Sequence, residues 1–445
     1  MIPIWLSLSK WNRWQRCGLA LGIATVVVFG ILVEVRSAYL KRRMGDLGVF
    51  VRTAWAVRSG EDIYTVTDPN GFHYHYPPLF AIFLVPLAEP PPGVDSSWTI
   101  PYPITVAIWY VLNVLCLAIS VHWLASALEE SPGGRVSPWA LRLLPVLACL
   151  PPIGHTLMRG QVSLLLLLLL SGMAVALLRG RRGRAGLWLA GAICLKVIPA
   201  FLLLDPLRRR DGRCLTGCAL GLVLGLAAIP AAVFGPARTW AYFQEWTHVL
   251  LWPALGPGTD QSRAKELIDV TATDSQSFQA VLHNTIHSDP TTRPRQPSTA
   301  VRCAHWLVGG FLTLATLWIG RRQQDGPAVI IRFGALVVLM LLLSPVCHLH
   351  YFCLSLPLAM GALAAVWNGP PRFSGRVGML IVLVLHGIAQ VLPHLPRLQV
   401  LRDGGLATYA TLLLWLSGMI LLWKRGRCYP LALPREQPVI SEAAA

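Results

Sequence analysis

One carboxylate, Asp46, stands a few residues beyond the first hydrophobic span of the chain, and another apolar run follows from Pro77. At a membrane surface, a carboxylate can accept the proton of a hydroxyl group that attacks a substrate. It can equally form a structural ion pair with the basic residues just before it, Lys41, Arg42 and Arg43. Asp46 is therefore the candidate catalytic base, and its position alone leaves both interpretations open.

Two histidines alternate with two tyrosines in the loop after Asp46, as His73-Tyr74-His75-Tyr76. In an extended segment, alternate side chains point to the same side, so the two imidazoles can face one ligand. No third ligand stands at a fixed spacing, and the ten cysteines, scattered mostly through apolar runs, suggest neither a zinc site nor a disulfide framework. We therefore predict no metal and no cofactor, with the tyrosines in an aromatic belt or a sugar-stacking surface.

The composition requires a membrane. Of 445 residues, 54% are hydrophobic and 13% are charged, with a mean hydropathy of +0.55. Because a bilayer core of about 30 Å needs about 20 apolar residues per helix, we predict an all-α polytopic integral membrane protein with roughly 10–12 transmembrane helices. Residues 1–427 form one integral domain and 428–445 a short cytoplasmic tail. The expected spans lie near 17–35, 103–127, 139–151, 162–178, 214–234, 303–320, 328–343, 351–367, 377–394 and 405–423.

The segment 186–207 is flanked by arginine-rich stretches at both ends, 179–184 and 208–213. Since cytoplasmic loops collect Lys and Arg, the chain should enter and leave the membrane on the same side here. Pro199 breaks a helix in the middle, and Lys196 beside it needs a partner or a polar cavity. We predict a re-entrant hairpin of two half-helices, with Lys196 either in the site or paired with Asp205.

This hairpin places the remaining basic clusters, near Arg321, Arg376 and Lys424, on the cytoplasmic side. The net charge of +17 then reflects topology and contact with anionic lipids, not with nucleic acid. On the outer side fall the loop 36–102, a turn at 155–161, the loop 235–300 and the turn 344–351. The outer loops carry most of the polar residues and should form an extracytoplasmic active face on a multi-pass protein of the inner (plasma) membrane.

Two of these loops invite a closer prediction. Apolar residues recur at helical spacing over 47–59, so an amphipathic helix should lie along the membrane surface and hold Asp46. The loop 235–300 mixes tryptophans with carboxylates in a way that suits carbohydrate contact. We expect this loop to cover the molecule that bears the attacking hydroxyl group, the acceptor. Its prolines also fit an irregular, solvated connection.

A series of short motifs, in order and over most of the chain, resembles the bacterial polyprenol-phosphate-sugar-dependent glycosyltransferases of glycosyltransferase family 87. The resemblance lies in Gly45-Asp46-Leu47-Gly48, Gly60-Glu61-Asp62-Ile63-Tyr64, Tyr76-Pro77-Pro78-Leu79, Gly160-Gln161-Val162-Ser163, Leu195-Lys196-Val197-Ile198-Pro199, Asp274-Ser275-Gln276-Ser277 and Ser344–Tyr351. It implies the C-type (GT-C) glycosyltransferase membrane fold. The chain departs from the family at Ser275, where an asparagine is common, and at Cys347 or His348, where an aromatic residue is common.

The resemblance implies transfer of a hexose, typically mannose, from a polyprenyl phosphate to a hydroxyl of a glycolipid or glycan on the outer side. With Asp46 as general base, single displacement would invert a β-linked donor to an α-linked product. The leaving phosphate needs fixed donors. The candidates for the donor phosphate are Arg159, Gln161, Lys196, His348, His350 and Tyr351, and those for other substrate contacts are Tyr76, Asp274 and Gln276.

Two other classes of membrane protein remain open. A polyprenyl-lipid flippase or transporter would use Lys196 and the outer histidines along a translocation path, which explains a broken hairpin. It does not explain the concentration of polar residues on one face, because a transporter needs ionisable groups in the middle of several helices. A structural membrane subunit would leave Asp46 free to be replaced. For His350, the alternative to a phosphate contact is an interfacial histidine.

Overall fold

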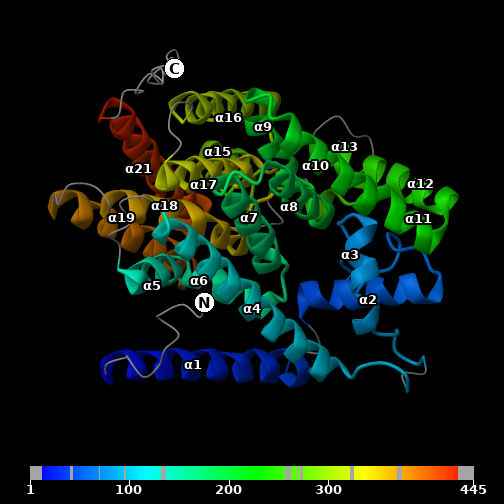
Figure 1. Cartoon of the computed structure of the whole chain (residues 1–445). Helices are drawn as coiled ribbons and strands as arrows, with labels where there is room; N and C mark the ends of the chain where they lie inside the picture. Colours follow the sequence, from blue (N-terminus) through cyan, green and yellow to red (C-terminus); the bar gives the residue numbers. More distant parts are fainter. Residues whose placement is uncertain are drawn as a thin grey trace, which may run out of the picture.

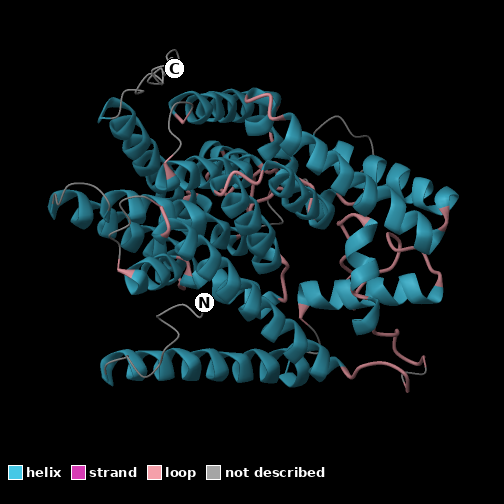
Figure 2. Ribbon diagram, in the orientation of Figure 1, coloured by secondary structure: helices cyan, strands magenta, loops and turns pink. Residues whose placement is uncertain are grey.

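The structure is a computed structural model that describes residues 13–40, 44–69, 71–94, 97–131, 137–255, 262–267, 269–270, 274–320, 325–367 and 373–428. Throughout these residues the regular elements are helices, and β pairing is confined to an isolated bridge between Thr67 and His73 (Figure 2). The predicted tail 428–445 lies outside the described residues except for Cys428, the last residue of α21.

Eight helices in the described part of the chain are long and apolar enough to cross a membrane. A ninth span is possible if α5 and α6, which meet at 62°, cross together, and the shorter α7 is also apolar. The predicted polytopic all-α membrane protein is therefore confirmed. The long helices are α1 (Arg13–Glu34, extended by η3, Val35–Leu40), α4 (Tyr102–Glu129), α10 to α11 (Gly212–Leu222, η6 Val223–Ala228, Ile229–Phe234), α16 (Thr299–Ile319), α17 (Gly326–Leu343), η8 with α18 (Leu349–Ser355, Leu356–Trp367), α19 (Phe373–Val391, followed by η9 Leu392–His394) and α21 (Leu406–Cys428); the others are α5 (Pro138–Ala148), α6 (Leu150–Arg159) and α7 (Ser163–Leu178).

The helices α17 and α18 form the centre of the bundle, and almost every residue of both is buried. They approach closely because a side chain is missing at the crossing: a Cβ added to Gly334 would lie 2.4 Å from the backbone nitrogen of Leu358. In contrast, α1 lies along one edge of the molecule with most of its apolar side chains exposed (Figure 1). Such exposure is expected of a helix that faces lipid.

Ion pairs between helix ends define one end of the bundle, which we call the basic end. Here Arg179 after α7 lies 2.9 Å from Glu130 after α4, and Arg425 on α21 lies 2.7 Å from Asp325 before α17. The same helices lead at their other ends to the residues around Asp46, which we call the Asp46 end. Figure 1 shows α2, α3, α11 and α12 at that end, on the right, and the C-terminal end of α21 at the opposite end.

The predicted hairpin is present, with unequal limbs. The first limb is α8 (Arg182–Leu195), and the second is a 3-10 helix, η5 (Ile198–Leu203), followed by the short α9 (Leu204–Arg208). The first limb starts and the second limb finishes at the basic end, as the ion pair between Arg182 and Asp211 at 3.5 Å shows. Lys196 breaks the helix in an extended conformation, with φ −153° and ψ 131°. The predicted alternative pair of Lys196 with Asp205 is wrong, since Asp205 is bonded instead to arginines, among them Arg209 at 3.0 Å.

The expected surface helix is α2 (Gly45–Ser59), which packs against α3 (Pro78–Phe83) and η4 (Val85–Leu87). Its apolar side chains are covered by protein: Leu47 and Val51 are fully buried, and the ring of Phe50 meets the ring of Phe80 at 5.1 Å. Protein therefore covers the apolar face of this helix, and its expected position along the membrane surface stays a prediction. Hydrophobic spacing alone does not say whether protein or lipid covers it.

The long loop 235–300 is largely helical in its described part, not irregular. It contains α12 (Pro236–Glu245), η7 (Trp246–Leu251), α13 (Trp252–Leu255), α14 (Ala264–Leu267) and α15 (Phe278–Ile286). It is fastened to the first loop, because Arg238 donates from Nη2 to the carbonyl oxygens of Gly60 and Glu61, each at 2.7 Å. The two segments thus form one layer at the Asp46 end.

Candidate active site

Asp46 lies in the first turn of α2, where the helix dipole favours a negative charge. Its Oδ2 accepts a hydrogen bond from Nε of Arg159, in the last turn of α6, at 3.0 Å. The Asp46 side chain is 24% exposed and that of Arg159 is 44% exposed, so both can be reached by a ligand. The cations considered from the sequence, 41–43, lie outside the described residues.

The turn after Arg159 fixes this pair. Gly160 has φ +69°, a conformation that favours glycine, and its carbonyl oxygen accepts a hydrogen bond from Nε1 of Trp109 at 2.9 Å. A Cβ at Gly160 would lie 2.7 Å from Cβ of Leu47 on α2. The close contact between α6 and α2 therefore depends on this glycine. The predicted turn at 155–161 is in fact the end of a helix followed by this tight turn.

Lys196, at the tip of the hairpin, reaches the same region. Its Nζ donates a hydrogen bond to Oη of Tyr351 and lies 4.1 Å from the centroid of that ring and 5.2 Å from the ring of Tyr76. Oη of Tyr76 in turn donates to Oε1 of Gln161 at 3.4 Å. Four residues predicted from separate parts of the sequence thus meet at one place, and two tyrosine faces stabilise the ammonium group.

Four histidines from three parts of the chain form a column beside these residues. The ring of His350 stacks on His348 at 5.5 Å and on His155 at 6.0 Å, and His155 stacks on His394 at 6.0 Å. His350 is fully buried, and neither of its ring nitrogens has a hydrogen-bond partner among the described residues. An unsatisfied buried donor or acceptor costs about 1–3 kcal/mol, so this position favours a polar ligand.

His348 stands in the turn between α17 and η8. Burial, together with the positive charges of Arg159 and Lys196, lowers the pKa of His348 to about 3. At neutral pH the imidazole is therefore uncharged, and it can both donate and accept a hydrogen bond.

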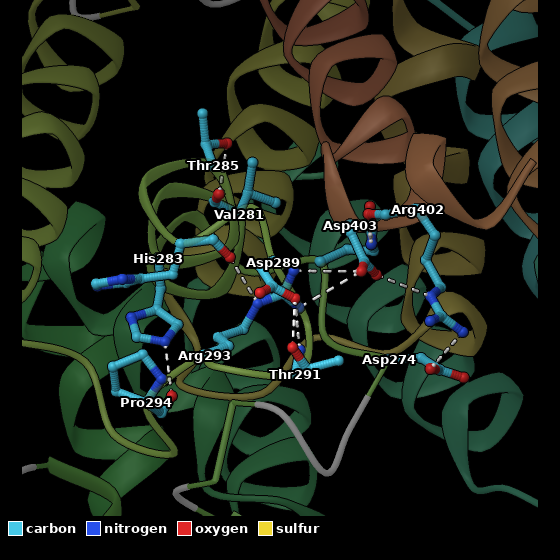
Figure 3. Close-up of polar contacts among 12 residues, drawn as sticks. Asp274, Val281, His283, Thr285, Asp289, Thr291, Arg293, Pro294, Arg402 and Asp403 are labelled. Atoms are coloured by element: carbon cyan, nitrogen blue, oxygen red, sulfur yellow. Dashed lines mark hydrogen bonds and ion pairs between the residues drawn. The ribbon is translucent and has the colours of Figure 1, made fainter.

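The remaining predicted residues, Asp274 and Gln276, lie within the loop 235–300, just before α15. Asp274 is 60% exposed and forms an ion pair with Nη1 of Arg402 at 2.8 Å; Figure 3 shows Arg402 between Asp274 and Asp403. Gln276 is buried, and its Nε2 donates to the backbone oxygen of Arg402 at 2.8 Å. Asp274 is therefore accessible to a ligand, whereas Gln276 holds two segments together.

Ser275, where an asparagine was expected from the family resemblance, has a local structural role. The Oγ of Ser275 accepts a hydrogen bond from the backbone nitrogen of Cys347 at 3.0 Å, and the backbone nitrogen of Gln276 donates to the carbonyl oxygen of Cys347 at 2.6 Å. These bonds attach the segment 274–277 to the turn that carries His348. Ser275 thus contacts Cys347, one of the two alternative positions of the second departure.

Two site residues were missed from the sequence, His155 and His394. His155 precedes Arg159 by one helical turn, so both point from the same side of α6. That spacing was a usable signal once the segment was recognised as a helix. His394 lies 239 positions after His155, and no local pattern indicates the contact between them.

No metal-binding arrangement is found within the residues described, where no group of three or more His, Cys, Asp or Glu side chains could hold an ion. His73 and His75 do face one side, as expected, and meet a carboxylate: Nδ1 of His73 and Nε2 of His75 each lie 2.8 Å from an oxygen of Glu266. Burial opposes the charge of Glu266, but the hydrogen bonds and charge of His75 and the bonds from His73 outweigh it and lower the pKa of Glu266 to about 2.

The arrangement combines an accessible carboxylate with cations and neutral hydrogen-bond donors around it. The carboxylate can take a proton from a hydroxyl group, and the cations can stabilise an anionic leaving group, which are the two requirements of a group transfer to an alcohol.

Comparisons with known proteins agree with this chemistry. The model of glycosyltransferase family 87 matches residues 74–345. A polyprenol-phosphate-mannose-dependent alpha-(1-2)-phosphatidylinositol mannoside mannosyltransferase of Mycobacterium tuberculosis is 27% identical over 366 residues, which cover 77% of this chain and 74% of that protein. The protein of the same name in Mycolicibacterium smegmatis is 26% identical over 331 residues, covering 70% and 68% respectively. The chain therefore belongs to glycosyltransferase family 87 and is a multi-pass membrane glycosyltransferase.

Proposed function

We propose that this protein transfers mannose from a polyprenyl-phosphate-mannose donor to a hydroxyl group of a glycolipid, with residues 1–427 as the catalytic unit. The donor and the acceptor class follow the two mycobacterial relatives, whose names specify polyprenol-phosphate-mannose and a phosphatidylinositol mannoside. The observation that supports this best is the meeting of Asp46, Arg159, Lys196 and Tyr351, from four separate elements, at one end of the bundle.

The carboxylate of Asp46 is the general base of the proposed reaction. It takes the proton of the acceptor hydroxyl while the hydroxyl oxygen forms a bond to the anomeric carbon. The bond from that carbon to the phosphate oxygen breaks, and polyprenyl phosphate leaves with the electron pair. Attack opposite the leaving group inverts the anomeric centre, so a β-linked donor yields an α-linked product.

The leaving phosphate is received by the cations and imidazoles around it. Arg159 carries a fixed positive charge, Lys196 offers an amino group beside the rings of Tyr351 and Tyr76, and His348 offers a neutral donor. The two unsatisfied nitrogens of the buried His350 support a further polar contact to the donor, because a bound ligand would remove the cost of leaving them unpaired. Charge-assisted hydrogen bonds of this kind contribute about 1.5–3 kcal/mol each.

The acceptor side is formed by the outer layer. Asp274, Tyr76 and the helices of 235–300 are the proposed contacts for sugar hydroxyls. We place this face outside the cytoplasm, in the plasma membrane, because the arginine-rich turns gather at the opposite end and such turns are retained in the cytoplasm.

A transfer assay in liposomes tests the proposal. Purified protein receives polyprenyl-phosphate-mannose with a mannosylated phosphatidylinositol acceptor, and parallel reactions receive a nucleotide-linked mannose or the polyprenyl-phosphate-linked glucose. We expect mannose transfer from the lipid-linked donor alone and an α-linkage in the product by NMR. Transfer from the nucleotide-linked sugar, or a β-linked product, would contradict the proposal.

A further inference from the structure

Arg159 uses only part of its guanidinium group to hold Asp46. The hydrogen bond runs from Nε to Oδ2 at 3.0 Å. Among the described residues, no hydrogen bond or ion pair engages Nη1 or Nη2 of Arg159, and its side chain is 44% exposed. The base therefore occupies one edge of the group, and the other donors are open to a ligand.

A guanidinium group suits two anions at once. It is flat, carries five N–H donors in fixed directions and stays protonated, so one edge can hold a carboxylate while another holds a phosphate. An ammonium group is a compact point charge on a flexible stem and does not fix the two partners relative to each other. Lys196 cannot take this role here, since its ammonium group is held by Tyr351 and Tyr76.

We infer that Arg159 bridges the catalytic base and the departing phosphate, binding Asp46 through Nε and the donor phosphate through its Nη groups. This inference rests on the proposed function. The base and the leaving phosphate lie on opposite sides of the anomeric carbon. Arg159 would fix the distance between them.

The charge changes of the reaction fit such a bridge. At the start, Asp46 is an anion and the donor is a phosphodiester with one negative charge. The proton of the acceptor hydroxyl goes to Asp46, the new carbon–oxygen bond forms, and the electron pair of the broken bond goes to the phosphate. Asp46 becomes neutral and the phosphate gains a second charge. Arg159 keeps its proton throughout, so the negative charge passes from one of its edges to the other without movement of the group.

The backbone around Arg159 supports this positioning. The residue after it is Gly160, whose carbonyl oxygen is held by Trp109 and whose Cα faces Leu47 of the helix that bears Asp46. The guanidinium and the carboxylate are thus carried by two elements in direct contact. A small change in the length or shape of the side chain at 159 would therefore separate the base from the phosphate.

The test is a double-mutant cycle of Asp46→Asn and Arg159→Lys. For transfer, we expect Arg159→Lys to lower kcat about 100-fold, because misplaced reacting groups cost about that much. The double variant should be about as active as Asp46→Asn alone, since residues that act as a unit show non-additive losses. Multiplied losses in the double variant would mean that the two residues act independently and would overturn the bridge.

A second experiment measures the binding of polyprenyl phosphate without sugar. It tests the contact between Arg159 and the phosphate even if the protein transfers another sugar. Arg159→Lys should weaken binding about 10-fold, the loss of one charge-assisted contact of about 1.4 kcal/mol. Asp46→Asn resembles the protonated base and should tighten binding about 5-fold in the wild-type background, because coupled residues differ by that order. In the Arg159→Lys background, Asp46→Asn should hardly change the affinity for polyprenyl phosphate.

Equal tightening in both backgrounds, or unchanged affinity in Arg159→Lys, would show that Arg159 does not bind the phosphate. Arg179→Lys is the matched control, because Arg179 also pairs with a carboxylate, Glu130, but at the basic end. It should leave kcat and affinity unchanged. Failure of the wild-type protein to transfer mannose, with the binding pattern intact, would refute the proposed donor sugar and leave the bridge supported.

Discussion

Lys196 and Tyr351, 155 residues apart in the sequence, are joined by a hydrogen bond from Nζ to Oη. This bond links the tip of the hairpin to the 3-10 helix η8, which also carries His350. The ammonium group lies over two tyrosine rings, and no carboxylate forms an ion pair with it in the described part of the chain. The amino group can therefore pair with an anionic ligand.

Replacement of Lys196 by Met should lower kcat about 100-fold, the usual effect of removing one charged donor to the transition state. The fold should tolerate the change, because an ammonium group in a largely apolar place is costly to bury. Kinetics and thermal unfolding of the same preparation check this. Tyr351→Phe keeps the ring and should have a smaller effect on kcat. A full loss of folding in Lys196→Met would assign the lysine a structural role.

Replacement of His350 by Leu should change protein stability and lipid binding in opposite directions. In the absence of substrate it should raise the unfolding temperature, because two unsatisfied nitrogens leave the protein interior. It should also weaken the binding of polyprenyl phosphate. Thermal unfolding with and without that lipid measures both effects. A variant that unfolds earlier but binds the lipid as well as wild type would show that His350 is a packing residue.

Gly160→Ala should destabilise the protein and slow transfer. The alanine would have to adopt φ +69° with its Cβ 2.7 Å from Leu47, and strained backbone of this kind costs about 1–3 kcal/mol before any clash is counted. The clash also pushes α6 away from α2 and so separates Arg159 from Asp46.

Gly180→Ala is its matched control. Gly180 has the same φ of +69°, at the basic end, with no atom within 4 Å of an added Cβ. It should show the backbone cost alone, about 1–2 kcal/mol by thermal unfolding, and normal kcat. If both alanine variants lose the same stability and Gly160→Ala keeps its kcat, the contact between α6 and α2 does not position the site.

The bonds of Glu266 to His73 and His75 should stabilise the contact between the loops 36–102 and 235–300, and the carboxylate should keep this contribution well below neutral pH. The pKa of Glu266 is lowered to about 2, so its stabilisation is fully present above the unfolded value of about 4.3 and is lost as the pH falls through about 2. Glu266→Gln should therefore lower the unfolding temperature, and the difference from wild type should not shrink between pH 7.5 and 4.5. A difference that closes already between pH 7 and 5.5 would contradict the low pKa.

Much of the fold follows from sequence because the membrane imposes simple rules. Span lengths identified the long helices, and the arginines on both sides of 186–207 predicted a chain that returns to the same end, as the pair of Arg182 and Asp211 confirms. What failed was local. The span expected at 139–151 and the turn expected at 155–161 are instead the two helices α5 and α6. Pro151 and Pro152 stand at the start of α6, because prolines are tolerated in the first turn of a helix, where no backbone donor is needed.

The structure brings several of the predicted site residues together, but the sequence did not predict their contacts. Asp46 and Arg159 were both singled out, but their pairing across 113 positions depends on how α2 and α6 pack, which no local spacing encodes. The burial of α2 was missed for the same reason, since periodicity marks an apolar face without identifying what covers it. His394 joins the histidine column only through the fold.

The central claim is that Asp46 is the base, and one measurement tests it most directly: mannose transfer from polyprenyl-phosphate-mannose by wild type and by Asp46→Asn in liposomes. Asp325→Asn is the control, because it removes a carboxylate that pairs with an arginine, Arg425, at the basic end. The account predicts that Asp46→Asn folds normally and loses about 100- to 10,000-fold in kcat, while the control retains full activity. Full transfer by folded Asp46→Asn would contradict the account.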